Sequence, residues 1–189
     1  MDPAFAPVFG ALIGALAGVA GALLTTRRQA RLERDKWLRG VRDAFASEVR
    51  SSVKELTTEL ASATHSMCWL CWLAKYAPDR LNREHLDQYD QEMHKLLPQI
   101  AGLCAMLAGM DVDVHKRLNI LLERVYQVDA QIGEAGLLFA DGRPETASKL
   151  ASHHATSLDL ENELPRVVAE AVRPYAIAPG ARGLDAEAA

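Results

Sequence analysis

The run of residues 5–24 constrains the fold of this chain more than any other feature, because it contains no charged side chain. In an α-helix about 20 residues extend roughly 30 Å, which matches the thickness of the hydrocarbon core of a bilayer. The sequence therefore predicts a single membrane-spanning helix, and we assign residues 1–26 as a transmembrane anchor.

A cleavable secretory signal is the alternative interpretation of this apolar run. Such a signal begins with basic residues, and the four residues that precede the run contain none. The small residues Ala20, Gly21 and Ala22 nevertheless resemble a cleavage site, so this alternative stays open.

Basic side chains follow the apolar run directly, with seven Lys or Arg against two acids between residues 27 and 42. An excess of Lys and Arg beside a membrane span is typical of its cytoplasmic side. We therefore expect the amino terminus outside and the bulk of the chain in the cytoplasm, at the inner (cytoplasmic) membrane. The same cluster could also bind anionic lipid head groups. The residues assigned to topology and lipid contact are Arg27, Arg28, Arg31 and Arg34.

Glycines recur at every fourth position within the apolar run, at Gly10, Gly14 and Gly18, with Gly21 close behind. Spacing of four places them along one face of a helix, where the absence of side chains lets two helices approach closely. The pattern predicts a glycine zipper that joins copies of this chain into a homo-oligomer. The alternative is that glycine is simply common in membrane spans.

The remainder of the chain is predicted to be helical. No proline occurs between Val8 and Ala77, and apolar residues recur three or four apart as far as Tyr76. This pattern predicts a helix that leaves the bilayer and ends before the Ala77-Pro78 stop signal. No stretch alternates apolar and polar residues between hairpin turns, so strands are not expected.

Three further helices follow, joined by short connections. Asn82 is the predicted N-cap of the second helix, which Pro98 should kink or split. Asp111 or Asp113 should cap the third, and the fourth should stop before Pro174. Short connections favour antiparallel neighbours, so the predicted fold is all-α: a single N-terminal transmembrane helix continuing into a cytoplasmic antiparallel four-helix bundle. The bundle takes residues 49–173, and residues 174–189 are expected to be a disordered tail.

Residues 27–48 remain as a basic helical stalk between anchor and bundle. The stalk still carries Trp37, Val41 and Phe45 on one face, which an isolated solvated helix does not need. A second copy of the stalk, paired as in a coiled coil, is the favoured cover for these side chains. The C-terminal tail and the membrane surface are the alternatives.

The densest cluster of reactive side chains is His65, Cys68 and Cys71, with His94 level with His65 in the antiparallel register of the first two helices. Imidazole and thiolate ligands in this arrangement could hold zinc. The surrounding residues, including Trp69 and Trp72, read as core material and favour buried thiols instead. No other cofactor is expected.

Enzyme motifs are absent from the sequence. It has no glycine-rich phosphate loop, no nucleophile elbow, no HExxH and no Glu-x2-His pair of the kind that binds two metals in helical bundles. The net charge of -4 is also too small for bulk electrostatic binding of nucleic acid. We therefore expect neither catalysis nor a nucleic-acid partner.

These features together predict an interaction or scaffold module: a single-pass, self-associating helical-bundle protein that presents its bundle to an unknown protein partner at the cytoplasmic membrane face. The first alternative is a membrane-perturbing effector whose glycine-zipper helices assemble a pore, although the apolar run offers no polar side chain to line one. The second alternative is a metal-binding helical bundle.

Overall fold

The computed structural model describes the backbone of residues 6–143 and 146–176, and the side chains of residues 21–143 and 146–176. Every regular element among these residues is an α-helix or a short 3-10 helix. The all-α prediction is therefore confirmed. The chain divides into two units, Met1–Ala46 and Ser47–Ala189, and each unit is described separately below.

Helix α1 runs without interruption over Ala6–Tyr76. The predicted end at Tyr76 is confirmed, and Gly40 does not break the helix. The predicted membrane span falls mostly on residues before 21, whose side chains lie outside the described part of the chain. From residue 21 onward, no described helical stretch combines the length and the hydropathy that a bilayer crossing requires.

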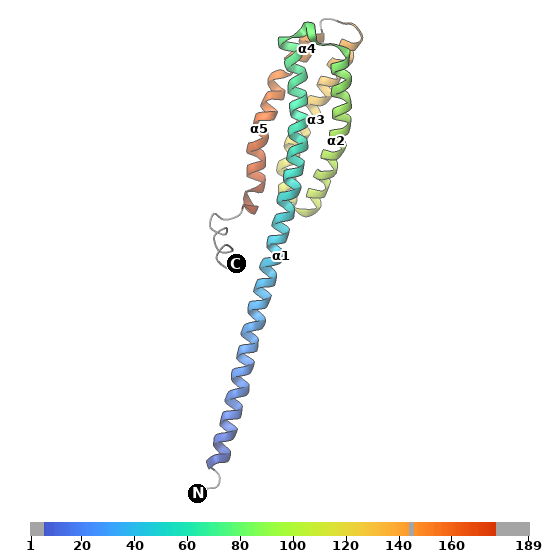
Figure 1. Ribbon diagram of the computed structural model, residues 1–189. Helices are drawn as coiled ribbons and strands as arrows, with labels where there is room; N and C mark the ends of the chain where they lie inside the picture. Colours follow the sequence, from blue (N-terminus) through green and yellow to red (C-terminus); the bar gives the residue numbers. More distant parts are fainter. Residues whose placement is uncertain (1–5, 144–145, 177–189) are drawn as a thin grey trace, which may run out of the picture. The chain divides into compact units, whose positions relative to one another are not determined.

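The second unit contains a four-helix bundle, as predicted (Figure 1). The last part of α1 leads through the 3-10 turn η1 (Pro78–Arg80) into α2 (Arg83–Met110), and α3 follows over Val112–Ala140. The fourth position is taken by α4 (Thr146–Ser152) and α5 (His154–Val172), which ends in the 3-10 turn η2 (Arg173–Tyr175).

Polar contacts between the helices show that neighbours run antiparallel. Ser66 on α1 donates to Glu92 on α2 at 2.5 Å, close to the predicted level of His65 with His94. Tyr89 on α2 donates to Asp129 on α3. Helix α5 in turn contacts both α3 and α1, so each long helix has two neighbours in an up-down-up-down arrangement.

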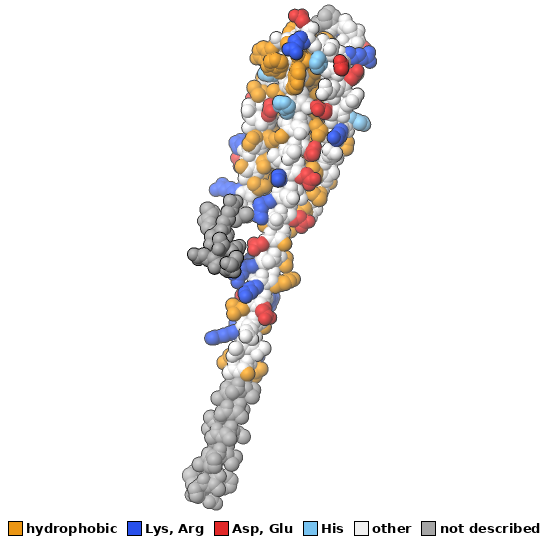
Figure 2. All heavy atoms as spheres, viewed as in Figure 1, with side chains coloured by type: hydrophobic (Ala, Val, Ile, Leu, Met, Phe, Trp, Pro, Cys, Tyr) orange, Lys and Arg blue, Asp and Glu red, His pale blue; other side chains and the backbone are white. Residues whose placement is uncertain are grey.

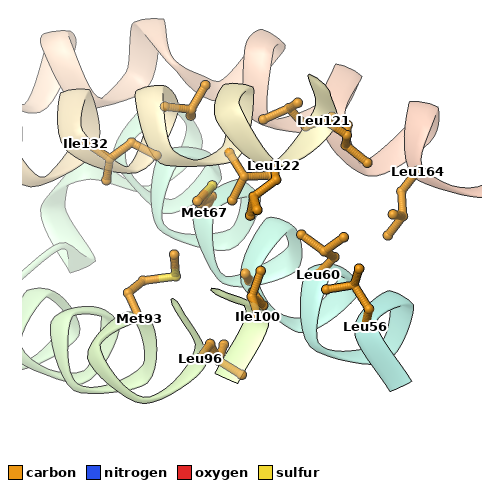
Figure 3. Packing of buried hydrophobic residues seen from close by; sticks show 14 of the residues in the cluster. Leu56, Leu60, Met67, Met93, Leu96, Ile100, Leu121, Leu122, Ile132 and Leu164 are labelled. Carbon is orange, nitrogen blue, oxygen red and sulfur yellow. The ribbon is translucent and has the colours of Figure 1, made fainter. Parts of the chain in front are cut away.

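The core of the bundle is almost wholly aliphatic. In Figure 3, side chains from α1, α2, α3 and α5 point into one shared interior. Burying each Leu or Ile side chain contributes about 1.5–3 kcal/mol relative to leaving it exposed, so this interior is the main source of stability. The largest fully buried side chains include Leu56, Leu60, Met67, Ile100, Leu121, Ile132 and Leu160.

Two predicted caps are confirmed by hydrogen bonds. Asn82 accepts from the backbone N–H of His85 at 3.1 Å and starts α2. Asp111 accepts from the N–H groups of Asp113 and Val114 at 2.8 and 3.0 Å and starts α3. Because Asp111 alone separates α2 from α3, this one extended residue makes the whole turn and caps the next helix.

Pro98 was predicted to kink or split α2, and the helix is not split. Pro98 lies on the exposed side of the helix, where water can satisfy the carbonyl that loses its donor. The fourth helix is not continuous but breaks at His153. Just before the break, the Ser152 hydroxyl donates to the carbonyl of Lys149 at 2.6 Å, and this local bond competes with helix continuation.

The prediction that Trp69 and Trp72 belong to the core is also wrong. Their side chains are 43 and 44 % exposed, whereas the neighbouring Leu70, Cys71 and Leu73 are buried. The reason is geometric: the stripe of α1 that faces the bundle is already filled at this level, and the two indoles lie to one side of it.

Order extends beyond the predicted start of the tail at residue 174. Tyr175 in η2 donates its hydroxyl to Asp111 Oδ2, and its backbone carbonyl accepts from Arg50 Nη1 at 2.7 Å. These bonds join the end of the α5–η2 segment to the α2–α3 turn and to α1. Residues 177–189, the rest of the predicted tail, lie outside the described residues.

The two bonding roles of Asp111 predict a large loss of stability on its removal. Asp111→Ala removes an N-cap, worth about 1 kcal/mol, and the acceptor of the Tyr175 hydroxyl, worth about another 1 kcal/mol. Asn82→Ala, which removes a cap only, is the matched control and should cost about half as much. Urea unfolding of the purified chain measures both losses, and equal losses would show that the Tyr175 contact contributes nothing.

Candidate functional site

The four candidate zinc ligands do not form a metal site. No three His, Cys, Asp or Glu side chains converge to hold a metal ion anywhere in the described residues. His65 instead lies exposed, with Nδ1 3.2 Å from Glu161 Oε1 on α5. Cys71 is buried, with its Sγ 3.9 Å from the Ser157 hydroxyl, and His94 lies exposed on α2.

The three cysteines are free thiols; Cys71 and Cys104 are buried, whereas Cys68 is only partly buried. Burial raises the pKa of Cys71 to about 12, and it also raises the pKa of Cys104. The pKa of Cys68 is raised by burial first and then by the neighbouring carboxylate of Glu161. Since the thiolate is the reactive form, all three are poor nucleophiles at neutral pH.

One ionisable pair lies inside the bundle between α2 and α3. The Tyr89 hydroxyl donates to Asp129 Oδ1 at 2.7 Å. Burial raises the pKa of Asp129 above its ordinary value of 3.8, and the bond from Tyr89 opposes that rise only in part. Burial and the carboxylate together also raise the pKa of Tyr89. Because the pair joins α2 to α3 within the bundle, we assign it a structural role.

Aromatic side chains gather on the surface where α1 ends. The rings of Trp69 and Trp72 meet edge to face, with centroids 5.9 Å apart, and Trp72 contacts Tyr76 at 5.8 Å. Tyr76 in turn meets the buried ring of His154 on α5 at 5.6 Å. The sequence signal for this cluster is three aromatic residues spaced three and four apart, of which Trp69 and Trp72 were predicted to lie in the core.

A groove of about 840 Å³ lies between α1 and α5 within the second unit. Its α1 wall is made of small side chains, and its α5 wall is made of valines. Arg50 and Lys54 stand at one end, whereas His65 and Glu161 stand at the other. The wall residues are Thr57, Thr58, Ala61 and Ser62 on α1, and Val168 and Val172 on α5.

The described part of the first unit exposes apolar and basic side chains together. Trp37 is 67 % exposed, Val41 48 % and Phe45 40 %. Figure 2 shows Lys and Arg side chains interspersed with hydrophobic ones along this segment. The predicted topology residues are all exposed: Arg27, Arg28, Arg31 and Arg34.

Most of the predicted glycine zipper cannot be placed. The side-chain surroundings of Gly10, Gly14 and Gly18 lie outside the described residues. Gly21 is exposed, and a Cβ added there would meet no atom within 4 Å.

Comparison with known proteins does not assign a family. No family model, curated protein or solved structure matches this chain. Function must therefore be argued from the surfaces described above.

The partly buried carboxyl of Asp129 predicts a pH-dependent stability. Because its folded pKa is raised, folding takes up a proton in the window just above pH 3.8, so stability falls as pH rises through that window. Asp129→Asn keeps an acceptor for Tyr89 and carries no charge. The variant should therefore gain stability relative to the natural chain as pH rises from 4 to 7, measured by urea unfolding at each pH.

Asp90, a neighbouring carboxylate that also raises the pKa of Asp129, supplies the control. Asp90→Asn should leave most of the pH dependence in place, because burial is the larger cause. A parallel stability profile for Asp129→Asn and the natural chain would show that folding does not shift the pKa of Asp129.

The reactivity of Cys68 should depend on Glu161. Glu161→Gln removes the negative charge beside the thiol, so the pKa of Cys68 should fall and its alkylation at pH 8 should become faster. Cys71, whose pKa burial holds at about 12, should stay unreactive in both proteins. Mass spectrometry of iodoacetamide-treated chain measures both rates, and an unchanged rate at Cys68 would contradict the assigned cause.

Proposed function

We propose that this chain is a single-pass, membrane-anchored helical-bundle protein that self-associates through its membrane-proximal helix. The bundle acts as an interaction or scaffold module that meets a protein partner at the cytoplasmic membrane face. The uncharged run 5–24 and the basic residues that follow it support the anchor and its orientation.

One observation carries the proposal of self-association. Along α1 of the second unit, residues spaced three, four and four apart are all buried, and they include Val49, Ser52, Leu56, Leu60, Ala63, Met67, Cys71 and Ala74. The same spacing continues towards the amino terminus to Phe45, Val41 and Leu38. These three side chains are 40, 48 and 37 % exposed, although they occupy the positions that the bundle buries further along the helix.

We infer that the stripe of Leu38, Val41 and Phe45 packs against the same stripe of a second copy of the chain. Two identical helices present identical stripes, so a symmetric pair buries each side chain against its own counterpart. Burying a Val or Phe side chain contributes about 1.5–3 kcal/mol, and Trp37 beside the stripe adds a large aromatic surface. The repeat of three contacts per 11 residues is close to the natural turn of an α-helix. The paired helices should therefore be nearly straight or slightly right-handed, rather than a left-handed coiled coil.

Disulfide crosslinking in native membranes tests this proposal. Val41→Cys places a thiol on the exposed stripe, and Asp43→Cys places one on the opposite side of the same helix turn. If two stalks pair through the stripe, mild oxidation should crosslink most of the Val41→Cys chain into a dimer and little of the Asp43→Cys chain. Non-reducing gel electrophoresis of the membrane fraction gives the dimer yield.

The natural cysteines at positions 68, 71 and 104 serve as an internal control, since the unsubstituted chain should give no dimer. Equal crosslinking at positions 41 and 43 would contradict pairing through the stripe. Recovery of the intact chain in the soluble fraction would contradict the anchor. Gly14→Leu distinguishes pairing through the membrane glycines from pairing through the stripe, because it weakens helix packing in the membrane and leaves the stripe residues unchanged.

A further inference from the structure

The groove between α1 and α5 is bounded at both ends by polar contacts. At one end Arg50 donates to the carbonyl of Tyr175 at 2.7 Å. At the other end His65 lies 3.2 Å from Glu161. Arg50 and His65 are 15 residues apart on α1, so the groove extends about 22 Å along the helix at 1.5 Å per residue.

The length of the groove fits a single acyl chain. Its volume is about 840 Å³, and it is largely open to solvent. A single acyl chain spans half of a 30 Å bilayer core, or about 15 Å, so one chain and its head group fit the available length.

The wall of the groove offers few hydrogen bonds to a ligand. The hydroxyls of Thr57, Thr58 and Ser62 donate to carbonyls of their own helix, at 2.6, 3.0 and 3.1 Å. Their donors are therefore occupied. An extended peptide would leave backbone groups unsatisfied against such a wall, whereas a hydrocarbon chain has none to satisfy.

Charge distinguishes the two ends. Arg50 and Lys54 lie at the end where α1 enters the bundle, and no acidic residue is among the lining side chains there. The acidic lining residue, Glu161, lies at the far end beside His65. Val168 and Val172 on α5 make the apolar wall next to the cationic end. The groove therefore combines a cationic end with a largely apolar lining.

We propose that this groove binds one long-chain fatty acid. Its carboxylate lies between Lys54 and Arg50, and its hydrocarbon chain runs past Val168 and Ala61 towards His65. The volume lies within the range of about 300–1,000 Å³ that is typical of small-molecule sites. The site lies wholly within the second unit and does not depend on the anchor or on self-association.

Photocrosslinking of the full chain tests the site directly. The purified chain, in nanodiscs of phosphatidylcholine, is irradiated with palmitic acid that carries a diazirine on its chain, and the labelled residues are mapped by mass spectrometry. Labels should fall on residues 54–65 and 164–172, and excess unlabelled palmitate should remove them. Labels confined to residues 5–24 or spread over the bundle surface would overturn the proposal.

Two variants and two matched controls separate the roles of charge and space. Lys54→Glu should reduce groove labelling about tenfold, the size expected for the loss of one charge-assisted contact, whereas Lys95→Glu on the exposed side of α2 should not. Ala61→Trp should fill the channel and reduce labelling to a similar degree, whereas Ala101→Trp should not. Equal labelling of Lys54→Glu and Lys95→Glu would overturn the assigned position of the head group.

A neutral probe completes the test. Hexadecanol that carries the same diazirine should label the groove less than the acid, and its labelling should not respond to Lys54→Glu. Far-UV circular dichroism of every variant shows whether the bundle is folded. If Ala61→Trp unfolds, Lys54→Glu and the neutral probe still decide, because both leave the walls of the groove unchanged.

Discussion

The chain of contacts from Arg50 through Tyr175 to Asp111 joins all the segments that meet at one end of the bundle. Asp111 makes the turn between α2 and α3 and caps α3, while its second oxygen accepts from the Tyr175 hydroxyl. Tyr175 in turn accepts from Arg50 on α1. At this end of the bundle, α2 and α3 are joined by the turn at Asp111. The bonds of Arg50 and Tyr175 fasten α1 and the α5–η2 segment to that turn.

The same periodic pattern serves two purposes along α1. In the second unit, residues at intervals of three, four and four fill the core against α2, α3 and α5. In the first unit, the pattern persists at Phe45, Val41 and Leu38, which are 40, 48 and 37 % exposed. Hydrophobic positions that persist beyond the fold that buries them are typical of an association surface, and the proposed pairing of stalks follows from this continuity.

Local signals in the sequence were sufficient for several helix boundaries but not for the break at His153. Tyr76 and Asn82 were placed correctly, and Asp111 was one of two predicted caps, because stop signals and caps act within a few residues. Trp69 was misplaced, since composition alone cannot tell which large side chain the neighbouring helices leave outside. The groove could not be predicted either, because it depends on how far α5 stands from α1, a distance that no local pattern of small residues determines. In the sequence, its lining residues, such as Thr57 and Ala61, do not differ from those of an ordinary solvent-exposed helix surface.

The hydrogen bond between Tyr89 and Asp129 has a consequence for the alignment of α2 with α3. An all-aliphatic interface tolerates sliding, since one leucine replaces another with little loss. Sliding by one helical turn would separate the phenol from the carboxyl and leave a partly buried charge without its donor. This pair therefore favours one register of the hairpin, together with the one-residue turn at Asp111 and the bond from the Tyr126 hydroxyl to the Leu97 carbonyl.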